Sequence, residues 1–244
     1  MLLVIPAAYA SIAAGLPETG PVPERAPREE TAPAPSGPQG EVEVDGKPAS
    51  PFDPAPPQPD EAALADCERR LAALGVEFER REAIDDPGRC GLPASYAVTD
   101  IAGGVSLAPD TRMTCETALA TARWVREVVI PAARVLGDDV RLTGIRQAST
   151  YVCRNRNGQS RAKISEHALG RAIDIAAFEF DGHASLSIVP EQRPGSVEKV
   201  FQRAVRAGAC LHFTTVLGPG ADTFHDDHIH LDLAKRRGGY RLCQ

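Results

Sequence analysis

The stretch "SEHALGRAIDI" at residues 165–175 decides the fold, because it passes from a turn into a strand within a few residues. It carries His167 and, seven residues later, Asp174, with Gly170 between them. Glycine permits the tight turn that this spacing needs. The segment "AIDIAAFEF" (172–180) is typical of a strand. We therefore expect His167 on a turn and Asp174 near the start of a strand.

A second stretch, "HDDHIH" at residues 225–230, holds three of the six histidines of the chain. His228 and His230 are two residues apart in a predicted strand, so both side chains leave the same face. Neutral imidazole and carboxylate are the usual ligands of catalytic zinc, with one position left for water. An H-x-H pair in a strand is more often structural, and a lone H-x6-D spacing is common by chance. Together, however, the two segments predict a metal site around Asp174.

Helices are predicted early in the folded part and strands later, which indicates an α+β domain with a mostly antiparallel sheet. One helix should begin after an N-cap at Asp60 and end at Gly75. Another should run from Thr114 towards Leu136, interrupted at Pro131. A third is expected over 195–208, with Val197, Val200, Phe201 and Val205 facing inward.

The strands that accompany 172–180 are short and bounded by turn residues. Asp181-Gly182 should turn the chain into "ASLSIV" (184–189) and form a hairpin. The other predicted strands are "VEFE" (76–79), "VRLTGI" (140–145), "ASTYVC" (148–153), "FTTVL" (213–217) and "HIHLDL" (228–233).

Three regions differ in composition. Residues 1–16 are apolar and signal-like, with an Ala8-Tyr9-Ala10 pattern but no charged n-region; the start is misassigned or the segment is a weak membrane anchor. Residues 17–59 hold 13 of the 21 prolines and predict a disordered linker, either a tether or a passive spacer. Residues 60–244 form the predicted folded domain.

The six cysteines contain no C-x-x-C pair and are scattered through 60–244, which favours disulfides in an oxidising compartment. The alternative is six buried thiols in a cytosolic protein. The sequence leaves the connectivity open, and pairing of sequence neighbours is our expectation. Those pairs are Cys67–Cys90, Cys115–Cys153 and Cys210–Cys243. With the signal-like segment, the cysteines indicate export to the periplasm or cell envelope.

Charge excludes one class of partner. The formal net charge is −6, and basic residues are mixed with acidic ones along the chain. Nucleic-acid binding requires clustered excess Lys and Arg, so no nucleic-acid partner is expected. The sequence does not indicate an oligomeric state.

The two histidine-bearing stretches carry a resemblance. "SEHALGRAIDI" followed by "HIHLDL" resembles the signature S-x-H-x-x-G-x-A-x-D, then H-x-H, of the zinc superfamily uniting lysostaphin-type peptidases, D-Ala-D-Ala metallopeptidases and hedgehog domains. With "STYVCRNRN" and "TVLGPGAD", the chain from 60 to 244 resembles the bacterial extensin-like C-terminal domain family.

The resemblance implies Zn²⁺ bound by His167, Asp174 and His230, with His228 as the catalytic histidine. It places His225 and Ser165 behind the ligands. Arg154 is expected either on a substrate carbonyl or carboxylate or, as the alternative, as a solvated arginine of the loop. A related branch carries Glu where this chain has Asp227, so Asp227 is the alternative base. His183 and His212 are expected to be structural.

The function that the resemblance implies is a zinc-dependent metallopeptidase acting on peptidoglycan peptide stems or cross-links. The alternative is a non-catalytic, zinc-stabilised module that binds the cell wall. A disulfide-stapled wall protein without metal is the third possibility. Endopeptidase and carboxypeptidase action stay equally open.

Overall fold

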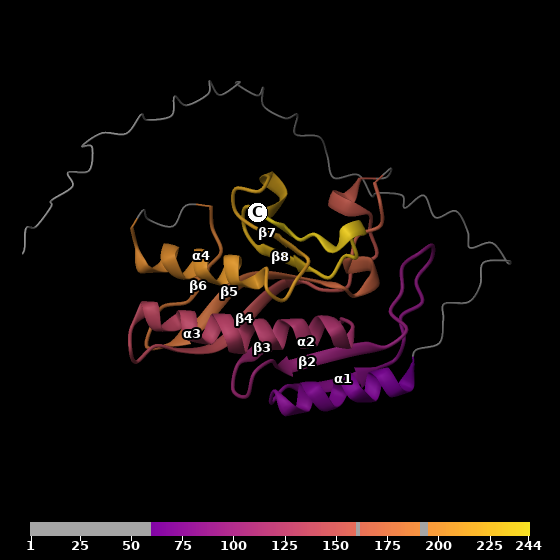
Figure 1. Ribbon diagram of the computed structural model, residues 1–244, viewed down its shortest axis with the longest axis horizontal. Coiled ribbons are helices and arrows are strands. Elements are labelled where there is room, and N and C mark those ends of the chain that lie inside the picture. The colour runs from indigo at the N-terminus through magenta and orange to yellow at the C-terminus, as the bar shows by residue number, and fades with distance from the viewer. Residues whose placement is uncertain (1–59, 160–161, 191–194) are drawn as a thin grey trace, which may run out of the picture. The chain divides into compact units, whose positions relative to one another are not determined.

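The computed structural model describes residues 60–159, 162–190 and 195–244. The predicted signal-like segment (1–16) and linker (17–59) therefore lie outside the described residues. The described part is α+β, as predicted, with helices packed on a mostly antiparallel sheet (Figure 1). In those three ranges, no helix has the length and apolar character needed to cross a membrane.

The helices begin where the sequence supplies caps. Helix α1 (Glu61–Ala73) starts after Asp60, whose side chain accepts hydrogen bonds from two backbone N–H groups. Helix α2 (Cys115–Trp124) follows Thr114, whose side chain accepts a hydrogen bond from the Thr117 N–H. The predicted interruption near Pro131 is a π-helical turn, Val125–Val129, followed by α3 (Ile130–Ala133) and a 3-10 turn (Arg134–Leu136).

The strands form one sheet in the order β1-β2-β3-β4-β5-β8-β7-β9, with β6 paired to β5 as the predicted hairpin. Only the β3–β4 and β7–β9 pairs are parallel among the described strands. The pattern missed β2, β3 and β9. The strands are β1 (Glu77–Arg81), β2 (Ser95–Asp100), β3 (Ser106–Ala108), β4 (Arg141–Ser149), β5 (Ala172–Asp181), β6 (Leu186–Ser187), β7 (Thr215–Leu217), β8 (Ile229–Asp232) and β9 (Leu242–Cys243).

The predicted strand 140–145 and the first residues of the predicted strand 148–153 belong to the single strand β4, whereas residues 150–153 lie outside any strand. The pairing of β4 with the long β5 is irregular at three places, so one strand continues through bulges rather than breaking. Gly144 lies at the first of these, where an added Cβ would come within 2.7 Å of the Ser106 Oγ. Residues beyond Ser149 leave the sheet and approach the His167 turn.

The inward face of α4 (Val197–Ala209) also differs from the prediction. Val197 and Val200 are 43% and 50% exposed, whereas Phe201 and Val205 are buried as expected. The buried face runs through Phe201, Gln202, Val205 and Ala209, so Val200 lies on the opposite side of the helix, and Val197 in the first turn is not part of the buried set.

One hydrophobic core lies between the helices and the sheet. Trp124 of α2 is fully buried, and its indole Nε1 donates a 2.9 Å hydrogen bond to the Val205 carbonyl of α4. Phe178 of β5 meets the ring of Phe201 edge-on, with centroids 5.2 Å apart. These contacts fasten α2 and α4 to the central strand β5, whose first residues carry Asp174.

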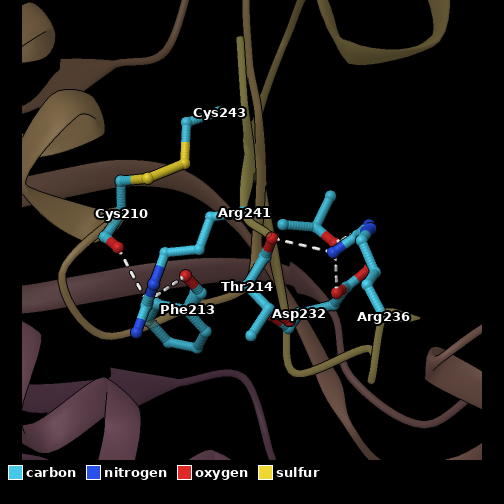
Figure 2. Close-up of a disulfide and its surroundings, with 8 residues drawn as sticks. Cys210, Phe213, Thr214, Asp232, Arg236, Arg241 and Cys243 are labelled. Atoms are coloured by element: carbon cyan, nitrogen blue, oxygen red, sulfur yellow. Dashed lines mark hydrogen bonds between the residues drawn. A yellow bond between two sulfur atoms is a disulfide. The ribbon is translucent and has the colours of Figure 1, made fainter. Parts of the chain in front are cut away.

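All six cysteines are paired, so the disulfide prediction is confirmed and the free-thiol alternative is wrong. Of the three predicted pairs only Cys210–Cys243 is correct (Figure 2). The others are Cys67–Cys115 and Cys90–Cys153. The packing of α1 against α2 decides the first, because it brings Cys67 beside the first residue of α2.

Removing the Cys67–Cys115 bond should lower the free energy of unfolding. A native disulfide in an exported domain typically contributes about 2–5 kcal/mol. We expect the double variant Cys67→Ser/Cys115→Ser to lose this amount in a denaturant titration and to show no free thiol when denatured. The control, Cys67→Ser/Cys90→Ser, should expose free thiols. A non-reduced digest that links Cys67 to Cys90 would contradict the pairing.

Candidate metal centre

The site lies on the face of the sheet opposite the core. Asp174 stands between Ile173 and Ile175, which are fully buried in the hydrophobic core. Side chains alternate along a strand, so the Asp174 carboxylate leaves the other face. On the neighbouring strand β8, Ile229 and Leu231 are likewise in the core. The apolar alternation in the two strands therefore sends Asp174 and His230 to one surface.

Strand register and one glycine turn bring three predicted ligands together. Asp174 lies directly opposite His230 in the antiparallel β5–β8 pair. His167 starts a 3-10 turn that ends at Gly170, where φ is +61°. A Cβ at Gly170 would meet Leu92 at 2.4 Å, so only glycine fits there. The turn places the His167 ring over the start of β5.

The ligand atoms of His167, Asp174 and His230 converge on one point. The Asp174 carboxylate lies 3.2 Å from the His167 Nε2 and 2.8 Å from the His230 Nδ1. The two ring nitrogens are 3.2 Å apart. Ligands about 2.0–2.1 Å from a tetrahedral zinc ion are about 3.3 Å from one another. The three side chains therefore fit a zinc ion in donor type and in spacing.

Hydrogen bonds behind the ligands select the nitrogens that face this point. The His167 Nδ1 lies 2.6 Å from the Thr150 carbonyl oxygen, and the His230 Nε2 lies 3.1 Å from the Asp232 carboxylate. A carbonyl and a carboxylate only accept, so each ring nitrogen beside them carries the proton. In the neutral rings, the opposite nitrogens, His167 Nε2 and His230 Nδ1, would then hold the lone pairs that a metal requires.

The electrostatics of the site also favour a cation. Burial raises the pKa of Asp174, but hydrogen bonds from His167 and His230 outweigh this effect and hold it well below its usual range. Burial lowers the pKa of His230, yet Asp174 and Asp232 raise it to about 9. The carboxylate is thus ionised and a positive charge beside it is stabilised. A metal ion would replace the proton on His230 Nδ1.

His228 lies beside the three converging groups, just before β8 begins. Its Nε2 is 3.6 Å from the Asp174 carboxylate, and its Nδ1 is 2.8 Å from the Asp227 carboxylate. Asp227 is 90% exposed and reaches the centre only through this imidazole. The pair therefore forms a carboxylate–histidine dyad, with the Nε2 directed at the site.

His225 is buried behind the same cluster. Its Nδ1 lies 2.6 Å from the Asp222 carboxylate, and its ring centroid is 5.4 Å from that of His228 and 5.6 Å from that of His230. Burial raises the pKa of Asp222, but the bonds from His225 and the Phe224 N–H lower it overall. His225 thus packs against both histidines of the H-x-H pair.

An open cleft of about 520 Å³ lies over these groups, within the size range of small-ligand sites. Arg154 and Arg156 line it from the loop after β4, and Phe224 lines it near His225. Ser165 fixes the start of the His167 turn, because its Oγ accepts a 3.3 Å bond from the His167 N–H. His183 and His212 do not line the cleft.

Several residues at the centre escaped the sequence prediction. Asp232 follows His230 by two residues, so the alternation that places His228 and His230 on one face extends to it. Asp222 supports His225, and Arg236 lines the cleft from the segment after β8. The Thr150 carbonyl carries no sequence signal, because any residue supplies that group.

The comparisons with known proteins match this part of the chain to one family. The model of the extensin-like protein C-terminus matches residues 65–244. No curated protein matches the chain. No solved structure matches it either.

Proposed function

The chain belongs to the extensin-like protein C-terminus family, and from this membership and the geometry of its site we propose that it is a zinc-dependent hydrolase of peptidoglycan peptides. The observation that carries the proposal is the convergence of His167, Asp174 and His230 beside a fourth, oriented histidine. Three ligands with an adjacent base make up a catalytic zinc site rather than a closed structural one.

The residues divide the work between binding and proton transfer. His167, Asp174 and His230 would hold Zn²⁺, which lowers the pKa of water and polarises a carbonyl when it is bound. His228 takes the proton of the attacking water on its Nε2, because Asp227 holds the Nδ1 proton 2.8 Å away. Asp227 stabilises the imidazolium that forms. Asp227, the alternative base, and His228 therefore act as one pair.

The cleft fits a charged peptide. Arg154 and Arg156 lie on one side of the zinc ligands, and both line the open space. Guanidinium groups bind carboxylates and carbonyls through paired hydrogen bonds. Peptidoglycan stems carry free carboxylates and D-centres, and the substrate class comes from the zinc-peptidase resemblance of the "SEHALGRAIDI" and "HIHLDL" stretches.

Three disulfides support an oxidising location, and we place the protein in the periplasm or cell envelope. The apolar residues 1–16 would direct export or give weak membrane attachment. Such a location would bring the cleft to the cell wall.

The test is digestion of purified muropeptides, monomeric and cross-linked, by the zinc-loaded full chain, with mass analysis of the products. A new peptide product that chelation abolishes and zinc restores supports the proposal. Cleavage of dimers to monomers identifies an endopeptidase, and loss of a terminal residue identifies a carboxypeptidase. Zinc-dependent binding of wall peptide without any product would replace the hydrolase by the binding module.

A further inference from the structure

His230 is held from behind by a buried carboxylate that the zinc signature does not include. The Asp232 Oδ2 lies 3.1 Å from the His230 Nε2, and the side chain of Asp232 is 6% exposed. The two residues are two positions apart on β8, so they leave the same face of the strand. Asp232 therefore touches the ring on the side away from Asp174.

The other oxygen of Asp232 is fully occupied by donors. The Ala234 N–H donates a 2.9 Å bond to the Oδ1, and the Thr215 hydroxyl contacts the same oxygen. The Arg236 guanidinium donates a 2.6 Å bond to the Thr215 Oγ1 and a 2.8 Å bond to the Thr214 carbonyl (Figure 2). Only the Oδ2 is left to face the imidazole.

The donor and acceptor of each hydrogen bond in this series, from Arg236 through Thr215 and Asp232 to His230, follow from the arginine at its start. Arginine has donors and no acceptor, so the Thr215 Oγ1 must accept from Arg236. The hydroxyl hydrogen of Thr215 then points at the Asp232 Oδ1. Asp232 accepts at both oxygens, so the His230 Nε2 must carry a proton.

We propose that Arg236, Thr215 and Asp232 are positioning residues that lock His230 with its proton on Nε2, so that Nδ1 is the metal ligand. This inference rests on the proposed zinc ligands and not on hydrolysis. It assigns a role to the segment after β8, which otherwise only lines the cleft.

The substitution Asp232→Asn separates this role from simple filling of space. The amide oxygen must take the Oδ1 position, because the Ala234 N–H and the Thr215 hydroxyl both donate there. The amide NH₂ is then forced towards the His230 Nε2, which has to become an acceptor. The proton moves to Nδ1, where it competes with the metal. In Asp232→Ala no donor faces the His230 Nε2, and a water molecule can accept the hydrogen bond from its N–H.

The experiment measures the zinc dissociation constant of the full chain by competition with a chromophoric chelator. Losing such a supporting carboxylate typically costs about 10–100-fold in metal affinity. We expect Asp232→Asn to lose at least as much as Asp232→Ala, although it is the closer mimic in shape. Asp181→Asn, an exposed carboxylate paired with Arg141, is the matched control and should equal the wild type.

The result that overturns the inference is an Asp232→Asn variant with wild-type affinity, or one clearly tighter than Asp232→Ala. Should Asp232→Asn fail to fold, the zinc-loaded wild type with ¹⁵N-labelled histidine decides instead. Its long-range ¹H–¹⁵N spectrum should show His230 protonated on Nε2, and a proton on Nδ1 would refute the proposal. Wild type that binds no zinc would refute the proposed metal centre as well, whereas zinc binding without hydrolysis would refute only the enzyme.

Discussion

His228→Ala is expected to keep its zinc and its fold while losing about 10²–10⁴-fold in the rate of muropeptide hydrolysis, the usual contribution of a general base. The Nε2 of His228 lies beside Asp174 but is not among the three converging ligand atoms. Removing the ring therefore deletes the proton acceptor and leaves the metal site complete. Zinc content and initial rate would be measured on the same preparation.

The companion variants sharpen that experiment. Asp227→Asn should slow hydrolysis less than His228→Ala, because Asp227 acts only through the His228 Nδ1. His183→Ala changes a histidine outside the cleft and should leave both zinc and rate unchanged. If His228→Ala lost its zinc, or if Asp227→Asn alone abolished turnover, the assignment of the base would be wrong.

Asp174→Ala and His167→Ala should each lose nearly all bound zinc, and hydrolysis with it. Each removes one of the three proposed protein ligands, and Asp174 is the sole negative charge among them. The zinc content after dialysis against a weak chelator, determined by elemental analysis, is expected to fall from stoichiometric to near zero.

An isosteric variant controls for loss of the fold. Asp174→Asn keeps the size of the side chain and should preserve the circular dichroism spectrum while zinc is lost. A wild type that carries no zinc after loading would contradict the metal centre. Variants that retained stoichiometric zinc would show that the ligands lie elsewhere.

Alternation around the ligands made much of the site predictable. Ile173 and Ile175 flank Asp174, and Ile229 and Leu231 flank His230, so the sequence alone indicates that Asp174 and His230 share the face opposite these apolar residues. The same rule extends to Asp232, which follows His230 by two residues but lies outside the H-x-H pattern. The Thr150 carbonyl could not be predicted, since backbone groups leave no trace in the sequence.

The errors in the fold have a common cause, which is contact between distant segments. Cys67 pairs with Cys115 because α1 packs on α2, and the cost of closing a longer loop rises too slowly with length to favour the nearer Cys90. β4 stays one strand because β5 supplies hydrogen bonds along its whole length. Local patterns do not contain these neighbours.

The short strand β9 has a consequence for handling the protein. It pairs with β7 next to the marked C-terminus, and Cys243 ties it to Cys210 at the end of α4 (Figures 1 and 2). Without the disulfide, only the pairing of two residues of β9 would cover the outer row of N–H and C=O groups on β7. An uncovered row of this kind recruits strands from other molecules. Chains produced in a reducing cytoplasm should therefore aggregate through β7, and oxidative secretion is the route to soluble material.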